Sequence, residues 1–353
     1  MRKSILLLAT AAALASCTQS EVLEVAENRA ISFDPFVGKA TRAATEIVDP
    51  SAGSGNKLTK FYVFGQYGES SGTTYDKVVY TNAEVDVTSS HTNVGPADNI
   101  QYWVPGKKYM FAAYSDGNNQ IQTTESGATV SFGNDGHIKI ENYQAGTNDL
   151  ILATADKTTE TSIQSDPGAV QLTFKHLLSQ VKFKFDCTAF PTGYQLTISD
   201  LKIENVPNKA TYSYVTSDYR WTGITTGNVG TLSFSNIAEF DKAQAQTSDA
   251  NFVIPQTYTE NVNSNLTATF KVTVKDNHGS NIVSDQPLTT TALLVSSGNV
   301  TQWQTGYRYQ YNIKLTPENV GGMYPIKFTV TTVEGWQDKP DNGNGTDLSL
   351  ASN

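Results

Sequence analysis

Alternation of apolar and polar residues with a period of two recurs along this chain and constrains its fold more than any other feature. In the segment 266–274 apolar residues alternate with Thr and Lys, and in 307–315 Tyr, Ile and Leu alternate with polar residues. This is the period of a β-strand with one buried face and one wet face. Between residue 31 and the C-terminus, no apolar 3.6-residue period persists over three or four turns. The sequence therefore predicts an all-β protein.

The composition supports strands and excludes some partners. Segments 58–64 and 109–114 are apolar on both parities, which predicts strands covered on both faces. Charged residues are 17% of the chain and the formal net charge is −9, with no stripe of Lys and Arg that could neutralise a row of phosphates. Nucleic acid is therefore a poor candidate partner, and neither a disordered chain nor a membrane bundle fits.

A change of parity divides the chain of 353 residues. Apolar residues occupy even positions in 170–178 and odd positions in 181–187, which requires a bulge, kink or turn between Leu177 and Gln180. The turn cluster Gln-Ser-Asp-Pro-Gly at 164–168 lies just before it. We expect an N-terminal β-sandwich domain at 31–165, a C-terminal one at 166–340 and a flexible tail at 341–353.

The N-terminus carries an export signal. Arg2 and Lys3 precede an apolar run at 5–14 that is too short for a permanent membrane anchor. The tetrad Leu-Ala-Ser-Cys at 14–17 is similar to the bacterial lipobox, which predicts a signal peptide at 1–16 and lipidation of Cys17, for example with palmitate. The alternative is an ordinary signal peptide with an incidental Cys nearby. Residues 17–30 are polar and acidic, as expected of a tether.

Three patterns that could carry catalysis or metal chemistry have simpler explanations. Gly-Glu-Ser-Ser-Gly at 68–72 matches a nucleophile elbow, but a strand rather than a helix is expected after it, which favours a hairpin turn. The histidines are scattered, and His176 shares parity with its apolar neighbours, as a hydrogen-bonded core residue would. Asn, Asp and Gly clusters at 116–119, 134–136 and 276–277 lack the spacing of a calcium loop. We expect no enzyme, cofactor or metal.

Two further side-chain types have open or inert interpretations. Trp103 and Trp221 could stack on sugars, although large aromatic side chains in sandwiches are more often part of the core. Cys187 lies on the apolar parity of its predicted strand, which favours a packed thiol over a reactive one. A glycan-binding function therefore stays open on the sequence alone.

A series of short motifs in fixed order resembles the fimbrillin family of Bacteroidetes, which comprises major and minor fimbrial subunits and Mfa-like proteins. The resemblance runs from Met1 to about Trp336 and is specific in its order rather than in any one segment. The motifs are the lipobox, Ile-Ser-Phe at 31–33, Lys-Ala-Thr-Arg-Ala at 39–43, and segments 58–65, 172–183, 303–311 and 333–336.

This resemblance implies a fold and a life cycle. It implies two tandem transthyretin-like antiparallel β-sandwich domains and a lipoprotein precursor, carried to the outer membrane surface, that polymerises into a type V pilus supporting adhesion. An arginine-specific protease would cut between Arg42 and Ala43, releasing the lipid together with the strand that contains 31–33. A strand from another fimbrial subunit would then fill the vacancy. An uncleaved Arg42 in a solvated loop is the alternative.

The C-terminus supplies the expected donor strand. Ile326, Phe328 and Val330 alternate with Lys and Thr, after a Gly pair and before a Gly- and Asn-rich spacer. The alternative is that this strand is the last strand of its own domain. A monomeric surface lipoprotein, as a tip or anchor subunit or an adhesin for glycan or host protein, is the competing function.

Overall fold

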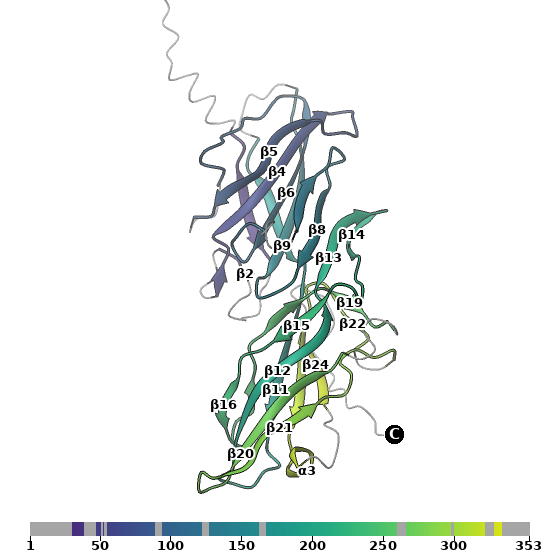
Figure 1. Cartoon of the computed structure of the whole chain (residues 1–353). Helices are drawn as coiled ribbons and strands as arrows, with labels where there is room; N and C mark the ends of the chain where they lie inside the picture. The colour runs from purple at the N-terminus through teal and green to yellow at the C-terminus, as the bar shows by residue number, and fades with distance from the viewer. Residues whose placement is uncertain are drawn as a thin grey trace, which may run out of the picture.

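The computed structural model describes residues 30–38, 47–50, 52, 55–88, 94–121, 127–161, 167–259, 266–297, 300–321 and, as backbone, 328–333. These residues form an all-β protein, which confirms the predicted fold class. The only described helix is the single turn α3 (Pro317–Val320), which Thr316 caps. Figure 1 shows the sheets gathered in two bodies, one below the other.

The first sandwich, as we call the upper body, consists of two sheets. A six-stranded sheet runs in the order β1 (Phe33–Val37), β10 (Val170–His176), β9 (Leu150–Thr158), β6 (Lys107–Asp116), β4 (Lys60–Glu69) and β5 (Lys77–Asp86). A four-stranded sheet runs in the order β14 (Asp218–Thr222), β13 (Lys209–Val215), β8 (Ile138–Gln144) and β7 (Thr129–Phe132). The short β2 (Ile47–Val48) and β3 (Asn56–Lys57) pair with each other.

The second sandwich, the lower body, also has two sheets. One contains β17 (Gln246–Thr247), β11 (Ser179–Asp186), β23 (Arg308–Lys314) and β24 (Phe328–Val333), with β18 (Asn251–Val253) also paired to β11. The other contains β15 (Val229–Ser233), β12 (Gln195–Pro207), β20 (Ala268–Lys275) and β21 (Asn281–Thr289), with β16 (Ile237–Phe240) also paired to β12. The short β19 (Gln256–Thr257) pairs with β22 (Gln302–Trp303).

Strands that are apolar on both parities lie in the middle of the first sandwich, as predicted. In β4, Phe61 and Val63 belong to one hydrophobic cluster, while Tyr62 and Phe64 belong to the cluster between the two sheets. Strands with strict alternation bury one face only, as β20 does in the core of the second sandwich. Most pairings are antiparallel, but β1 pairs parallel to β10 and β23 parallel to β11.

The change of sheet falls later in the chain than the sequence predicts. The expected boundary between residues 165 and 166 precedes β10, yet β10 pairs with β9 and β1 in the first sandwich. The chain enters the second sandwich at Leu177 and Leu178, between β10 and β11, where the parity changes. The later hairpin β13–β14 also joins the first sandwich, because β13 pairs with β8. The first sandwich therefore uses residues from both predicted domains, whereas the described strands of the second sandwich all lie in the predicted C-terminal domain.

The junction between the two bodies is packed and hydrogen-bonded. Leu177, Leu178 and Phe252 are buried in the same cluster as the facing sheets of the first sandwich. Trp221 on β14 donates its indole N–H to the Leu177 carbonyl oxygen at 2.8 Å. Apolar burial of this kind favours one fixed arrangement of the two bodies over a flexible linker.

Candidate functional site

The first strand, β1, is held on both of its sides. Along one side all five of its residues pair parallel with residues 170–174 of β10. Along the other side, Phe33 exchanges two backbone hydrogen bonds with Val94, of 2.7 and 3.0 Å, and the Ile31 N–H donates to the Gln101 carbonyl oxygen at 2.8 Å. Removing β1 would therefore leave two unpaired backbone edges that face each other.

The side chains of β1 fill an apolar groove between these edges. Phe33, Pro35 and Val37 are buried, whereas Phe36 is 52% exposed. The Phe33 ring centroid lies 5.5 Å from that of Phe111, with two further aromatic partners, Tyr80 at 6.0 Å and Phe61 at 6.1 Å. At about 1.5–3 kcal/mol for each large apolar side chain, the strand contributes several kcal/mol of burial to the first sandwich.

Two carboxylates hold the ends of the segment that contains the predicted cleavage site. The Val37 N–H, at the end of β1, donates to Asp49 Oδ2 at 3.1 Å. The Ile47 N–H, at the start of β2, donates to Asp149 Oδ2 at 2.9 Å. Lys39, Arg42 and Ala43 lie between these anchors, outside the described residues. The two anchors differ, because Asp49 contacts the strand before the site and Asp149 contacts the chain after it.

Asp149 belongs to a buried polar cluster. Its Oδ2 lies 2.9 Å from His176 Nδ1, and both side chains are almost fully buried, which agrees with the predicted core histidine. Nearby, the Tyr143 hydroxyl donates to Asp116 Oδ1 at 3.1 Å. Burial, more than the neighbouring Asp149 charge, raises the pKa of Asp116 to about 6. Burial and the Asp116 charge raise the pKa of Tyr143 well above its ordinary value.

The predicted donor strand lies at the edge of its own sheet in this chain. Among the described strands β24 pairs with β23 alone, antiparallel, and its register places Phe328 opposite Ile313 and Val330 opposite Tyr311. Both partners are fully buried in the second core. Ile326 lies outside the described residues. The monomer thus has the arrangement that the sequence left as the alternative, and donation stays a prediction about another state of the protein.

The other candidates do not assemble into a chemical site. Ser70 lies in the turn between β4 and β5, and Cys187 is buried, with the pKa of its thiol raised to about 11 by burial. Trp103 is buried and His137 stacks on Tyr214. Within the described part of the chain, no group of three His, Cys, Asp or Glu side chains could hold a metal. Cys17 lies outside it.

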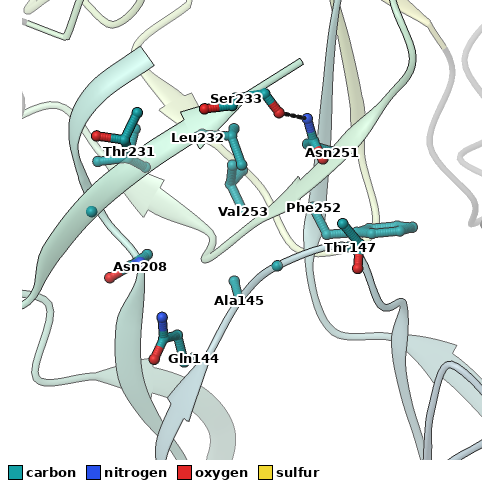
Figure 2. Close-up of a pocket in the computed structure, with 13 residues that line it drawn as sticks. Gln144, Ala145, Thr147, Asn208, Thr231, Leu232, Ser233, Asn251, Phe252 and Val253 are labelled. Carbon is teal, nitrogen blue, oxygen red and sulfur yellow. Dashed lines mark hydrogen bonds between the residues drawn. The ribbon is translucent and has the colours of Figure 1, made fainter. Parts of the chain in front are cut away.

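One cleft at the junction tests the glycan hypothesis. It has a volume of about 210 Å³ and lies among residues 144–147, 206–208, 230–233 and 251–253 (Figure 2). Its walls combine amide and hydroxyl side chains and backbone with the aliphatic side chains of Val206, Leu232 and Val253, and Asn251 Nδ2 already donates to the Ser233 carbonyl oxygen at 2.9 Å. The one aromatic residue there, Phe252, is fully buried. The cleft therefore offers no ring face on which a sugar could stack.

Sequence reasoning predicted the strand but missed its partners, and the release site at Arg42 stays a prediction. Val94, Gln101 and Asp49 hold β1, yet they lie in irregular segments without an alternating pattern. Asp149 directly precedes an apolar strand, which is a position that a turn residue fills equally well. The one sequence feature that pointed to this cluster was His176, which shares the parity of its apolar neighbours. A histidine buried in this way needs a hydrogen-bond partner.

A sequence profile described as fimbrillin-like matches residues 41–336 of the chain. The chain belongs to the fimbrillin-like family. It is thus a cell-surface fimbrial or adhesin protein, and this membership points to a structural rather than an enzymatic role. The match begins at Thr41, next to the predicted cleavage site, so β1 lies outside it. Among curated proteins, none matches the sequence.

Several solved structures from Bacteroides and Porphyromonas species match the chain at low sequence identity. A proposed cell adhesion protein from Bacteroides ovatus has a TM-score of 0.47 and 17% identity, over 88% of this chain and 99% of that one. Another, from Bacteroides uniformis, has a TM-score of 0.42 and 14% identity over 88% and 99%. The fimbrial anchor protein from Porphyromonas gingivalis has a TM-score of 0.32 and 11% identity over 91% and 100%. Among the residues described here, no helix is long and apolar enough to cross a membrane.

Proposed function

We propose that this fimbrillin-like protein is a structural pilus subunit that polymerises by strand exchange. It would be exported as a lipoprotein attached to the outer membrane through Cys17, cleaved between Arg42 and Ala43 by an arginine-specific protease, and joined to other fimbrial subunits at the cell surface. The observation that carries the proposal is β1, which lies upstream of Arg42 and fills a groove with partners on both sides.

Release of β1 would create the acceptor for another strand. The vacated groove has two backbone edges and a floor that contains Phe61, Tyr80 and Phe111. An extended segment with alternating apolar residues can satisfy the edges and the floor at the same time. The residues between β1 and β2 join the strand to the rest of the chain, so a single cut at Arg42 separates the two covalently.

The C-terminal strand is the donor that we propose. β24 has one paired neighbour among the described strands, so it can leave its sheet by breaking one ladder, whereas an inner strand must break two. The positions of Phe328 and Val330 in its register make them the residues that would enter the groove, together with Ile326.

Assembly of a cleaved, lipid-free chain tests the proposal. A protein that begins at residue 18 is treated with an arginine-specific protease, and mass spectrometry checks that the large fragment starts at Ala43. We expect SDS-resistant ladders from the cleaved protein and none from an Arg42→Ala variant. A synthetic peptide of residues 30–42 in excess should block ladder formation, and the same peptide with Phe33→Asp should not.

A matched pair of variants tests the donor. Val330→Lys should prevent ladder formation, while Thr331→Lys, at the next register position, should permit it. Ladders formed equally well by Val330→Lys would refute donation by β24. A cleaved protein that stays monomeric throughout would favour the competing function of a monomeric surface lipoprotein. Fatty-acid labelling that persists in a Cys17→Ala form would refute the anchor.

A further inference from the structure

One outer face of the second sandwich is basic. In β11, Val181, Phe183 and Phe185 belong to the core, so the alternate residues lie on the outer face of the sheet. In β23 the core residues are Tyr309, Tyr311 and Ile313. The residues of opposite parity on these two parallel strands include four cations, which we call the basic face: Lys182, Lys184, Arg308 and Lys314.

The charge of this face is not balanced by its own strands. Asp186 is the one acid at the same parity in β11 and β23, so the cations are in excess by three in a chain whose net charge is −9. On other sheet faces lysines have close acidic partners, such as Lys202 with Glu204 at 2.6 Å. In the described part of the chain, no ion pair within 4.0 Å involves Lys182, Lys184 or Lys314.

The positive charges of Lys182 and Lys184 lie close together on this face, which is energetically unfavourable unless an anion lies near them. Lys182 is half-buried, and its burial, followed by the nearby charge of Lys184, lowers the pKa of its ammonium group. On the same face, Gln310 Nε2 donates to Asn312 Oδ1 at 2.9 Å, and neither amide carries a negative charge. A carboxylate close to both lysines would relieve the repulsion and the loss of solvation.

The chain itself supplies a suitable anion next to this face. β24 ends at Val333, whose register partner is Arg308. The segment that follows, 334–353, contains one lysine and four acids, namely Glu334, Asp338, Asp341 and Asp347. Since strands lie about 4.8 Å apart, about three extended residues reach from β24 to β11. The acids of the segment follow one another at intervals of three to six residues, so several can reach the face together.

We propose that segment 334–353 docks on the basic face of its own chain and thereby holds β24 in its own sheet. The docking stands by itself, whereas its consequence for assembly rests on the proposed strand donation. If β24 leaves to enter another subunit, the acidic segment leaves with it and the basic face loses its counter-charges. The ionic contacts therefore oppose premature release of the donor strand.

Carbodiimide cross-linking of the full chain tests the docking directly. A mixture of nitrogen-14 and nitrogen-15 protein distinguishes links within one chain from links between chains. We expect links within one chain from Lys182 or Lys184 to acids of 334–353, and their loss in about 0.5 M salt, which screens exposed charges within a few ångströms. Links spread equally to Lys202 and Lys271 would overturn the proposal. Links only between chains would also overturn it, and would indicate that a second copy occupies the face.

Hydrogen exchange tests the effect on β24. The double variant Lys182→Gln with Lys184→Gln should speed amide exchange in β24 by about fivefold, the factor that a contact of about 1 kcal/mol represents. The control is Lys202→Gln with Lys271→Gln, on the other sheet, where both lysines have acidic partners. Equal rates in both double variants would overturn the proposal. Failure of ladder formation alone would refute strand donation and leave the cross-links unchanged.

Discussion

The two sandwiches hold their terminal strands in different ways. In the first, β1 lies between β10 and the segment around Val94, and its Phe33 contacts three aromatic rings. In the second, β24 lies at the edge of its sheet as far as the chain is described, and its one partner there is β23. Loss of β1 opens a groove with two edges, whereas loss of β24 exposes a single edge. Under the proposed strand exchange, the first sandwich would accept a strand after cleavage and the second would release one by breaking a single described ladder.

The largest expected effect concerns Phe33, the side chain of β1 that fills the groove. In the uncleaved chain, Phe33→Ala should lower the free energy of unfolding of the first sandwich by about 4 kcal/mol, because it empties a fully enclosed aromatic site. Phe36→Ala, on the exposed side of the same strand, should change it by about 0.5 kcal/mol or less. Urea unfolding followed by circular dichroism measures both. Equal effects would mean that β1 is not the strand that closes the core.

The sequence predicts those parts of this contrast that depend on interactions between residues near one another in the chain. It misses the parts that depend on contacts between distant segments. The apolar–polar alternation in 307–315 predicts β23, because a strand with one buried face shows a period of two in its own sequence. The strand that contains 31–33 was expected from the family resemblance. The parity change near Leu177 correctly marks the passage between sheets. The membership of β13 in the first sandwich depends on pairing with β8, about 70 residues earlier, and on Trp221 reaching Leu177. No local pattern reports such contacts, so the predicted boundary fell before β10.

The next effect concerns the buried Asp–His pair of the first sandwich. Asp149→Asn keeps an acceptor for the Ile47 N–H but removes the charge that faces His176, and should lower the free energy of unfolding by about 3 kcal/mol. The second sandwich offers a control, Asp276→Asn, because Asp276 Oδ2 lies 3.9 Å from the exposed His278. That change should have a much smaller effect, because solvent screens this exposed pair. Thermal unfolding compares them, and similar losses would contradict a special role for the buried pair.

A pH effect should also separate the two sandwiches. Burial raises the pKa of Asp116 from 3.8 to about 6, so this carboxyl contributes stability below pH 4 that is lost as the pH rises through 6. Asp116→Asn should remove that loss and raise the free energy of unfolding at pH 7 by about 2 kcal/mol. Hydrogen bonds from the Ser280 and His278 N–H groups lower the pKa of Asp276 in the second sandwich, which gives the opposite slope.

Unfolding in urea at pH 4, 5, 6 and 7 measures this difference. The Asp116→Asn and wild-type stabilities should converge at pH 4 and separate progressively between pH 4 and pH 6, because the unfolded chain releases the Asp116 proton near pH 4 whereas the folded chain retains it up to about pH 6. Curves that stay parallel across the whole range would show that Asp116 does not carry the pH dependence. Asp276→Asn, measured in the same series, should lower stability at pH 7 rather than raise it, and this loss should shrink towards pH 4, because the lowered pKa of Asp276 stabilises the fold only while the carboxyl is charged.

The smallest expected effect concerns the tie between β1 and the chain beyond the cleavage site. Asp49 Oδ2 accepts the Val37 N–H at the end of β1. A cut at Arg42 would leave this hydrogen bond in place while removing the covalent link between β1 and the rest of the chain. Asp49→Ala should lower stability by about 1 kcal/mol and, in the cleaved protein, speed the loss of the first strand about fivefold. Asp34→Ala is the matched control, because Asp34 lies on β1 itself and accepts an exposed hydrogen bond from Gln171 Nε2 on β10. Release can be followed with a fluorophore at residue 30. If both variants lose the strand at the wild-type rate, the ladder and the Phe33 site alone hold β1, and the segment around Asp49 has no part in the timing of release.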